Sequence, residues 1–509
     1  MPLNKFTSAD NAVALIRDGD TVALIGGGGG LVEASCLFTA VEKRFLTTGH
    51  PRDLFVVHAL GIGDRKTRGM NCFAHEGMVR RVIGGHWVWS PRMQALARDE
   101  KIEAYVLPGG VTMQLFREIG AGRPGLFTHV GLGTFVDPRL EGGRLNKRAR
   151  EDLVEVVEVA GREFLRYKPF PVNVALIRGS AADAHGNISL EQEPANLDIY
   201  AAALAAHNSG GTVIAQVRNA VDVGSLPARA VRVPGVLVDA VVVDPEQRMT
   251  YDIVHDPSLS GERRAPVPLE PPQPFTVRQA IARRAAMELA DGAVINYGFG
   301  IPDAVAKLVA ARGELDRYCQ TIEHGTYGGT LLDGTLFGFA RNPSAMIDAP
   351  SQFDFYSGGG LDIAFLGFGE VDAKGHVNVS KLGGLPIGPG GFIDIAQNAR
   401  KVVFCGTFDT KGTEIKTGDG KLAVLRQGEV KKLVRAVEQI TFSGTEALRR
   451  GQQAIYVTER AVFRLTPDGI LLEEIAPGVD LRRDVLERMD FAPLLPRDPA
   501  IMPSECFSA

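Results

Sequence analysis

Four glycine clusters are the residues of this sequence best suited to bind an anion. They lie at residues 26–30, 108–110, 358–360 and 388–391. The last three lie outside any helical pattern, so we expect them to expose backbone N–H groups. Such groups suit a bound anion or an oxyanion that forms during a reaction.

The first cluster, residues 26–30, follows an expected strand and precedes an expected helix, which is where a phosphate-binding loop lies. It lacks the Lys-Ser or Lys-Thr of a Walker motif, and it is not a spaced G-x-G-x-x-G with an acidic partner about twenty residues later. A bound nucleotide cofactor is therefore the less favoured interpretation. The alternative is that these glycines only let a helix pack close to a strand.

A glutamate, Glu323, lies in the segment T-I-E-H-G-T-Y-G-G at residues 321–329. Taken alone, a glutamate is usually a surface or helix-capping residue. Elsewhere in the chain, His75, Glu76 and His376 show no metal-ligand spacing. The five cysteines lack C-x-x-C spacing, so the sequence predicts neither a metal site nor a disulfide framework.

Two halves of the chain are built on one plan. The Pro-rich residues 257–275 lack periodicity and predict a linker between domains at 1–256 and 276–509. Thr276 is the expected N-cap of an amphipathic helix, and a strand at 294–297 then leads into glycines and another helix. The N-terminus repeats this order, with Ser8 opening a helix and a strand at residues 21–25.

Alternating helices and short β-branched strands predict an α/β fold of two tandem related domains, each with a mainly parallel sheet flanked by helices. Ligands then belong at the carboxyl ends of the strands. A cleft between two related domains is the expected place for a substrate too large for either domain.

The segment around Glu323 resembles the catalytic glutamate motif of the family I coenzyme A transferases. Further resemblances follow in the family's order: N-x-G-x-G-I-P at residues 296–302, G-G-x-D-x-x-x-L-G at 359–367 and G-G-x-x-D at 390–394. They cover both halves and are nearest to the single-chain propionate and acetate CoA transferases of bacteria. The resemblance implies the coenzyme A transferase fold with its active site in the interdomain cleft, and no cofactor besides CoA and acyl-CoA as substrates.

Roles for individual residues also follow from the resemblance. Glu323 is expected to be the nucleophile that carries CoA as a glutamyl thioester, and the amide of Gly391 to contribute to the oxyanion hole. Gly109 stands where many relatives have a glutamine, so it can supply only a main-chain N–H as the second donor, which we expect it to do. The candidates for the CoA and acyl pocket are Gly26, Gly28, Phe299, Gly300, Tyr327, Gly359, Gly360 and Phe392.

The expected reaction is the transfer of CoA from a short-chain acyl-CoA to a free carboxylic acid, by a ping-pong mechanism through an acyl-glutamyl anhydride. Arg341, Lys381 and Lys401 are possible contacts for CoA phosphates, although solvated surface is the favoured interpretation of each. Two alternatives stay open: an acyl-CoA hydrolase on the same fold, and a catalytically silent protein that binds CoA or another anion.

Composition excludes other partners. The 509 residues carry a formal net charge of -4, which predicts no attraction to nucleic acid or to an anionic membrane. The N-terminus leaves no room for a signal peptide, and no apolar run approaches the roughly 20 residues of a membrane span. We therefore expect a cytoplasmic enzyme that acts on acyl-CoA and small carboxylates, and that forms a homo-oligomer, a dimer or a tetramer.

Overall fold

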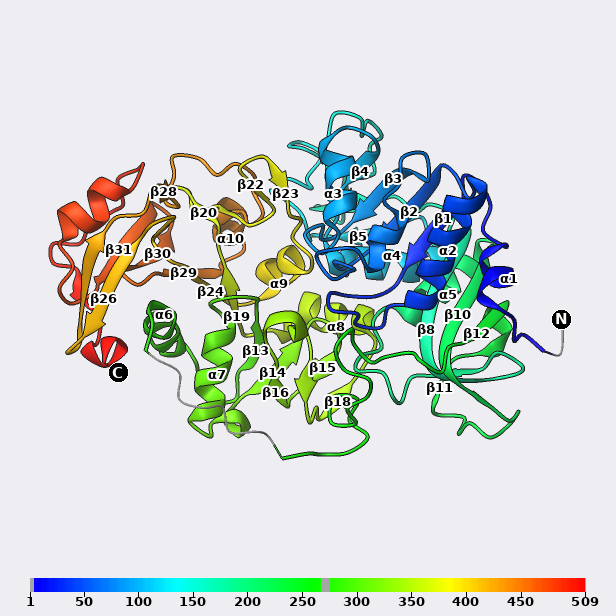
Figure 1. Ribbon diagram of the computed structural model, residues 1–509. Coiled ribbons are helices and arrows are strands. Elements are labelled where there is room, and N and C mark those ends of the chain that lie inside the picture. Colours follow the sequence, from blue (N-terminus) through cyan, green and yellow to red (C-terminus); the bar gives the residue numbers. More distant parts are fainter. Residues whose placement is uncertain (1–3, 267–274, 509) are drawn as a thin grey trace.

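The computed structural model describes residues 4–266 and 275–508, which form two α/β units side by side (Figure 1). Strands of the first sheet all precede residue 244, and strands of the second all follow residue 293. Residues 267–274 of the predicted linker lie outside the described residues. The preceding stretch packs on the second unit, because the Asn342 N–H donates to the Ser258 carbonyl at 2.7 Å.

The first unit is centred on a mainly parallel sheet. Its order is β11-β9-β8-β1-β2-β3-β4, and β10 pairs with both β8 and β12. The strands are β1 (Thr21–Leu24), β2 (Leu54–His58), β3 (Val79–Gly84), β4 (Glu103–Tyr105), β8 (Val174–Asp183), β9 (Ile188–Ser189), β10 (Thr212–Val221), β11 (Val231–Val233) and β12 (Ala240–Val243). The helices are α1 (Ala9–Val13), α2 (Ser35–Thr48), α3 (Pro91–Arg98), α4 (Gly109–Gly120) and α5 (Ile199–Asn208).

The second unit repeats the plan around a larger mixed sheet, in the order β18-β15-β14-β13-β19-β24-β29-β30-β31-β32. Its strands are β13 (Val294–Tyr297), β14 (Cys319–Ile322), β15 (Thr326–Tyr327), β18 (Ala345–Met346), β19 (Ile363–Gly367), β24 (Lys401–Cys405), β29 (Gln453–Val457), β30 (Ala461–Thr466), β31 (Gly469–Ile475) and β32 (Ala500–Ile501). The helices are α6 (Val277–Ala286), α7 (Asp303–Ala311), α8 (Ala349–Phe355), α9 (Phe392–Asn398) and α10 (Gly444–Arg449).

Smaller antiparallel elements decorate both units. A three-stranded sheet has the order β5-β7-β6, and five two-stranded ladders lie in the second unit as described. These strands are β5 (Leu126–Thr128), β6 (Val154–Val159), β7 (Arg162–Tyr167), β16 (Thr330–Leu331), β17 (Ala340–Arg341), β20 (Glu370–Val371), β21 (Val377–Asn378), β22 (Lys381–Leu382), β23 (Leu385–Pro386), β25 (Asp409–Thr410), β26 (Glu414–Gly418), β27 (Lys421–Arg426), β28 (Val430–Lys431).

The two sheets share a topology, which confirms the predicted fold class. In the first unit β1 lies between β2 and β8, and in the second β13 lies between β14 and β19, with parallel pairing in every case. Strands β1, β2 and β8 are buried at every position, as expected for parallel strands covered by helices on both faces. The carboxyl ends of β13, β14 and β19 therefore meet at one edge of the second sheet.

The predicted helix starts are present at both places. The Ser8 hydroxyl accepts the N–H of Asn11, and Thr276 forms a capping box with Gln279. The glycines at 109 and 110 differ from the prediction, because they are the first residues of α4 and do not lie outside a helix. Helix α4 lies where the two units meet and packs against α8 and α9 of the second unit (Figure 1).

Candidate active site

Glu323 follows directly after β14, at the carboxyl edge of the second sheet. The chain turns there because Gly325 adopts a φ of 97°, and its N–H donates to the Ile322 carbonyl at 3.0 Å. A β-carbon at Gly325 would lie 2.0 Å from the Ile347 carbonyl oxygen. Only glycine therefore fits this turn, which fixes the direction in which Glu323 leaves the strand.

The carboxyl group of Glu323 is largely removed from solvent. Its side chain is 18% exposed, and burial raises its pKa to about 7. Among residues 4–266 and 275–508 its carboxylate accepts no hydrogen bond. A carboxylate held this way is poorly solvated, which makes it a stronger nucleophile than the same group in water.

The neighbouring His324 is a buried lining residue and not a cation. Its Nε2 lies 3.8 Å from Glu323 Oε1, and burial lowers its pKa to about 4. Its Nδ1 lies 3.1 Å from the Gly338 carbonyl oxygen, which can only accept, so Nδ1 carries the proton. The neutral ring turns an unprotonated Nε2 toward Glu323 and offers it no positive charge.

Gly391 lies directly against this carboxylate. A β-carbon at Gly391 would lie 1.8 Å from Glu323 Oε2 and 2.9 Å from its Cδ. Gly391 is the N-cap of α9, and its own N–H has no acceptor within the described part of the chain. The structure thus places a buried carboxylate beside Gly391, whose backbone N–H is unused among the described residues.

Gly109 is close to the same place, but its N–H is already used. It donates to the Gly390 carbonyl at 2.7 Å, across the contact between the two units. The expectation that Gly109 supplies the second oxyanion donor is not supported by this geometry, because an N–H engaged with a carbonyl does not point at a reacting oxygen. Its role is to fix the loop before Gly391.

Asp394 makes the same contact from the other side, and sequence reasoning gave it no role beyond its place in a motif. Its carboxylate accepts the N–H groups of Gly110 at 3.1 Å and Val111 at 3.0 Å, at the start of α4. Burial, with a smaller contribution from the charge of Glu323, raises the pKa of Asp394 to about 8, and the N–H groups oppose this shift.

The C-terminal end of α9 is also bound by residues of the first unit. The Gly131 N–H donates to Gln397 Oε1 at 2.7 Å, and Gln397 Nε2 donates to the Leu132 carbonyl at 2.9 Å. His129 Nε2 lies 2.7 Å from Asn398 Oδ1. Because Gly391 is the N-cap of α9, these bonds help to hold Gly391 in position beside Glu323.

A layer of buried polar groups lies beneath Glu323. Thr321 Oγ1 lies 2.8 Å from the Tyr356 hydroxyl, and Asn296 Nδ2 donates to the same hydroxyl at 3.3 Å. Tyr327 pairs with Thr321 across β14 and β15, and its ring packs on Phe355 with centroids 6.1 Å apart. Tyr327 thus belongs to this supporting layer.

The mouth of the site is aromatic and is contributed by both units. Phe299 is half exposed and packs edge-on against Phe337 at 5.2 Å. A β-carbon at Gly28 would lie 2.3 Å from the Trp89 ring, so this glycine lets Trp89 approach the loop. The guanidinium of Arg65 lies over both Trp89 and Phe299. Two predicted pocket residues, Gly28 and Phe299, are thus linked here through Trp89 and Arg65.

The other predicted pocket residues lie elsewhere. Gly26 faces Glu33 inside the first unit, and Gly300 adopts a φ of 93° on the loop after β13 with open space around it. Three assignments need correction. Phe392 is 9% exposed and packs into the core against Phe404 of β24, whereas Gly359 and Gly360 precede β19 and so lie at the edge of the sheet opposite Glu323.

No group of three or more His, Cys, Asp or Glu residues is placed to hold a metal ion in residues 4–266 and 275–508. Over the same ranges, no helix is long and apolar enough to cross a bilayer.

Comparisons with known proteins agree with this geometry. The family model described as Coenzyme A transferase matches residues 6–244. The chain is 42% identical over 507 residues to the acetate CoA-transferase YdiF of Escherichia coli K12, covering 98% of this chain and 94% of that protein. It is 44% identical over 513 residues to the caffeate CoA-transferase of Acetobacterium woodii, covering 99% and 97%.

A solved structure of YdiF from another Escherichia coli strain is also similar to this chain. The acyl-CoA transferase YdiF of Escherichia coli O157:H7, in a thioester complex with CoA, superposes with a TM-score of 0.94 at 42% identity. That alignment covers 99% of this chain and 96% of the solved chain.

Proposed function

The chain belongs to the family I coenzyme A transferases and moves CoA between an acyl-CoA and a carboxylate, and we propose that it does so on short-chain acids through a covalent intermediate on Glu323. The observation that carries this proposal is the contact between the buried Glu323 carboxylate and Gly391, whose N–H is unused among the described residues. A relative solved as a CoA thioester complex supports it.

The reaction begins at the thioester carbonyl. The Glu323 carboxylate attacks it, the C–S bond breaks, and an acyl-glutamyl anhydride forms with release of CoA thiolate. The thiolate then attacks the glutamyl carbonyl and expels the first acid as its carboxylate, which leaves CoA on Glu323 as a thioester. A second carboxylate reverses both steps, so the kinetics are ping-pong and no proton is lost or gained overall.

Each attack passes through a tetrahedral oxyanion that needs stabilisation. The N–H of Gly391 is the donor that we assign to it, since it lies beside the Glu323 carboxyl group and its position is fixed through α9. Removal of one such donor typically costs about 2.7–4 kcal/mol in the barrier. Burial of Glu323 adds to the effect, because hydrogen bonds to a developing charge are stronger where water is excluded.

A transfer assay tests the function directly. With acetyl-CoA and propionate we expect propionyl-CoA and acetate in equal amounts, with parallel lines in double-reciprocal plots. Free CoA and acetate in the absence of an acceptor would instead favour the hydrolase. Binding of CoA without turnover would favour a silent binding protein.

The range of acids is tested by varying the acceptor. The relatives include one named for acetate and one named for caffeate, so the panel runs from acetate, propionate and butyrate to caffeate. We expect the highest kcat/KM with the short acids, and a preference for caffeate would contradict that part of the proposal.

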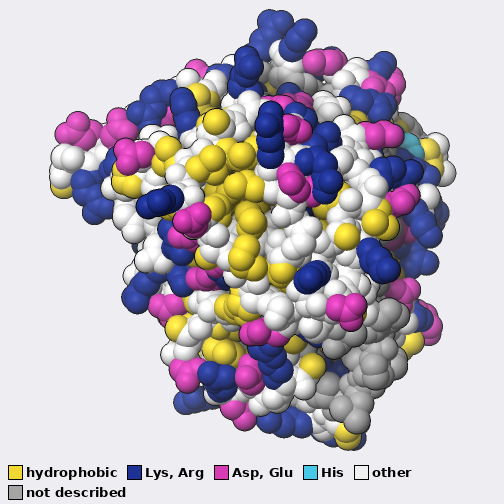
Figure 2. All heavy atoms as spheres, turned by 90° about the vertical axis from the view of Figure 1, so that its left-hand side faces the viewer, with side chains coloured by type: hydrophobic (Ala, Val, Ile, Leu, Met, Phe, Trp, Pro, Cys, Tyr) yellow, Lys and Arg dark blue, Asp and Glu magenta, His cyan; other side chains and the backbone are white. Residues whose placement is uncertain are grey.

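We also propose that the enzyme is cytoplasmic and assembles with copies of itself. Large hydrophobic side chains are exposed at the end of the second unit, and Figure 2 shows hydrophobic side chains gathered on that face. Four of them are Leu425 on β27, Leu494 and Leu495 in the loop before β32, and Ile501 on β32. Light scattering tests this: we expect a dimer or tetramer that Leu425→Lys with Ile501→Lys weakens, whereas a monomeric parent would contradict it.

A further inference from the structure

Arg65 is an exposed cation at the mouth of the active site, and it is held by aromatic rings from both units. Its guanidinium carbon lies 4.3 Å from the centroid of the Trp89 ring and 5.7 Å from that of Phe299. Its backbone is in the left-handed region with a φ of 64°, and its N–H donates to the Trp89 carbonyl at 3.0 Å. A bulky residue in this strained conformation is kept only where its surroundings enforce it.

The charge of Arg65 is unpaired. In the parts of the chain that the structure describes, no carboxylate lies within 4 Å of its guanidinium, and no hydrogen bond from it is formed. Stacking on Trp89 and Phe299 holds the group without using its N–H donors, because cation–π contacts engage the flat face. The donors at its edge are therefore available to a ligand.

Topology places this group near Glu323. Strands β13 and β14 are parallel neighbours about 4.8 Å apart, and Phe299 and Glu323 follow their carboxyl ends at the same edge. The ring of Phe299 packs on Phe337, and the next residue, Gly338, bonds His324. The exposed Arg65 therefore lies over a residue of a loop that leaves the same sheet edge as Glu323.

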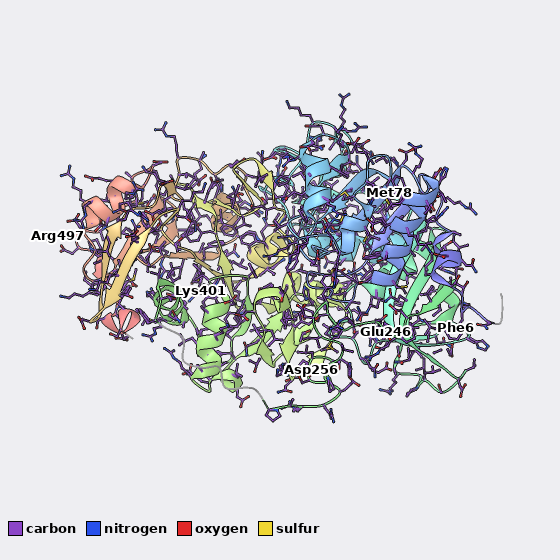
Figure 3. The ribbon with its side chains drawn as sticks, viewed as in Figure 1. Phe6, Met78, Glu246, Asp256, Lys401 and Arg497 are labelled. Atoms are coloured by element: carbon purple, nitrogen blue, oxygen red, sulfur yellow. The ribbon has the colours of Figure 1, made fainter. Side chains whose placement is uncertain are left out.

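The basic residues suggested by the sequence are already used or lie elsewhere. Arg341 Nη1 lies 2.9 Å from Asp256 Oδ2, and Lys381 lies 3.9 Å from Glu438. Lys401 pairs with Glu288 at 3.1 Å at the beginning of β24, beside α6 and at the edge opposite Glu323 (Figure 3). Unlike Arg65, which lies over Phe299, none of these three residues contacts the aromatic residues described at the mouth of the site.

We propose that Arg65 binds the phosphate groups of the CoA substrate. The proposal rests on the proposed function. A short acid must bring its single carboxylate to the buried Glu323 carbonyl, so it cannot also reach an exposed group at the mouth. CoA carries its phosphates at the end of the pantetheine arm remote from sulfur, so a thioester on Glu323 directs them outward. The planar guanidinium edge matches a phosphate through paired N–H donors.

Steady-state kinetics of Arg65→Ala and Arg65→Lys test this, with Arg80→Ala as the control. Arg80 is an exposed arginine of the same unit that lies over Phe55 at 6.0 Å, on β3 and away from the site. Because the mechanism is ping-pong, KM for acetyl-CoA and KM for propionate are measured separately. We expect Arg65→Ala to raise KM for acetyl-CoA about tenfold, as for loss of a hydrogen bond to a charged group, and to leave KM for propionate unchanged. Arg65→Lys should restore part of the loss.

S-acetylpantetheine, which lacks the phosphates, identifies the source of the effect. With this substrate the parent chain and Arg65→Ala should have equal kcat/KM. An equal loss with both substrates, a raised KM for propionate, or no change with acetyl-CoA would each overturn the assignment. Failure of the proposed function is distinguishable, because the parent chain would then form no thioester on Glu323 at saturating acetyl-CoA, whatever Arg65 does.

Discussion

Replacement of Gly391 by alanine tests the central contact of the site with a single methyl group. The φ of Gly391 is -84°, which alanine adopts without strain, so the backbone conformation is not the obstacle. The obstacle is space: the new β-carbon would lie 1.8 Å from Glu323 Oε2 and 3.2 Å from Phe353 Cζ. Either the carboxylate or the start of α9 must move by more than about 1 Å, a displacement that typically costs about 10²-fold in rate.

Either displacement should lower kcat. Movement of Glu323 misaligns the nucleophile, and movement of α9 withdraws the oxyanion donor, which alone is worth about 10²–10³ in kcat. We therefore expect Gly391→Ala to lower kcat by about 10²–10³-fold with little change in KM for acetyl-CoA. Overpacking should also lower the free energy of unfolding by about 1–3 kcal/mol, which leaves the protein folded.

The assay is the initial rate of CoA transfer, with thermal unfolding followed in parallel. The matched control is Gly358→Ala, because a β-carbon there meets nothing within 4 Å and Gly358 lies at the opposite edge of the sheet from Glu323. The control should keep the parental kcat. A Gly391→Ala variant with parental kcat would refute the placement of Gly391 against the reacting carboxylate.

Three further predictions follow from the same geometry. The kcat/KM for acetyl-CoA should rise with pH and level off above about 7, because only ionised Glu323 attacks and its pKa is raised to about 7 by burial; a flat pH profile from 5 to 9 would contradict this. Asp394→Asn should lower the free energy of unfolding by about 1–3 kcal/mol and also lower kcat, since the amide NH₂ leaves one N–H of α4 without an acceptor. Denaturant titration and initial rates measure the two effects. Parental values of both would show that Asp394 does not position the active site. Tyr356→Phe should cost about 1 kcal/mol in stability through loss of its 2.8 Å bond to Thr321, and kcat should fall severalfold if this layer supports Glu323, whereas an unchanged kcat would make the layer purely structural.

Short-range sequence patterns were enough to predict much of the fold, and a local motif was enough to predict the nucleophile. The helix N-caps at Ser8 and Thr276 could be predicted because the capping side chain and its backbone partner lie within three residues of each other. The strand β14 before Glu323 was not predicted, because Gln320 and Thr321 give its end no apolar pattern. The catalytic role of this glutamate was predicted from the family motif, because its neighbouring residues alone do not indicate a nucleophile.

The contacts between the two units could not be predicted from the sequence. Asp394 meets the N–H of Val111 across more than 280 residues, and the Gly109 N–H finds the Gly390 carbonyl across a similar separation. No periodicity or spacing encodes such pairs, because they exist only when the units are packed together. For the same reason the sequence could not show that Phe392 turns into the core or that Arg65 joins Trp89 to Phe299.

Mass spectrometry of the enzyme after incubation with acetyl-CoA tests the central claim most directly. The account predicts an adduct of the mass of CoA on the peptide that contains Glu323, absent from Glu323→Gln and Glu323→Ala and discharged by added acetate. An adduct on another residue, or turnover that persists in both variants, would contradict the assignment of Glu323 as the nucleophile.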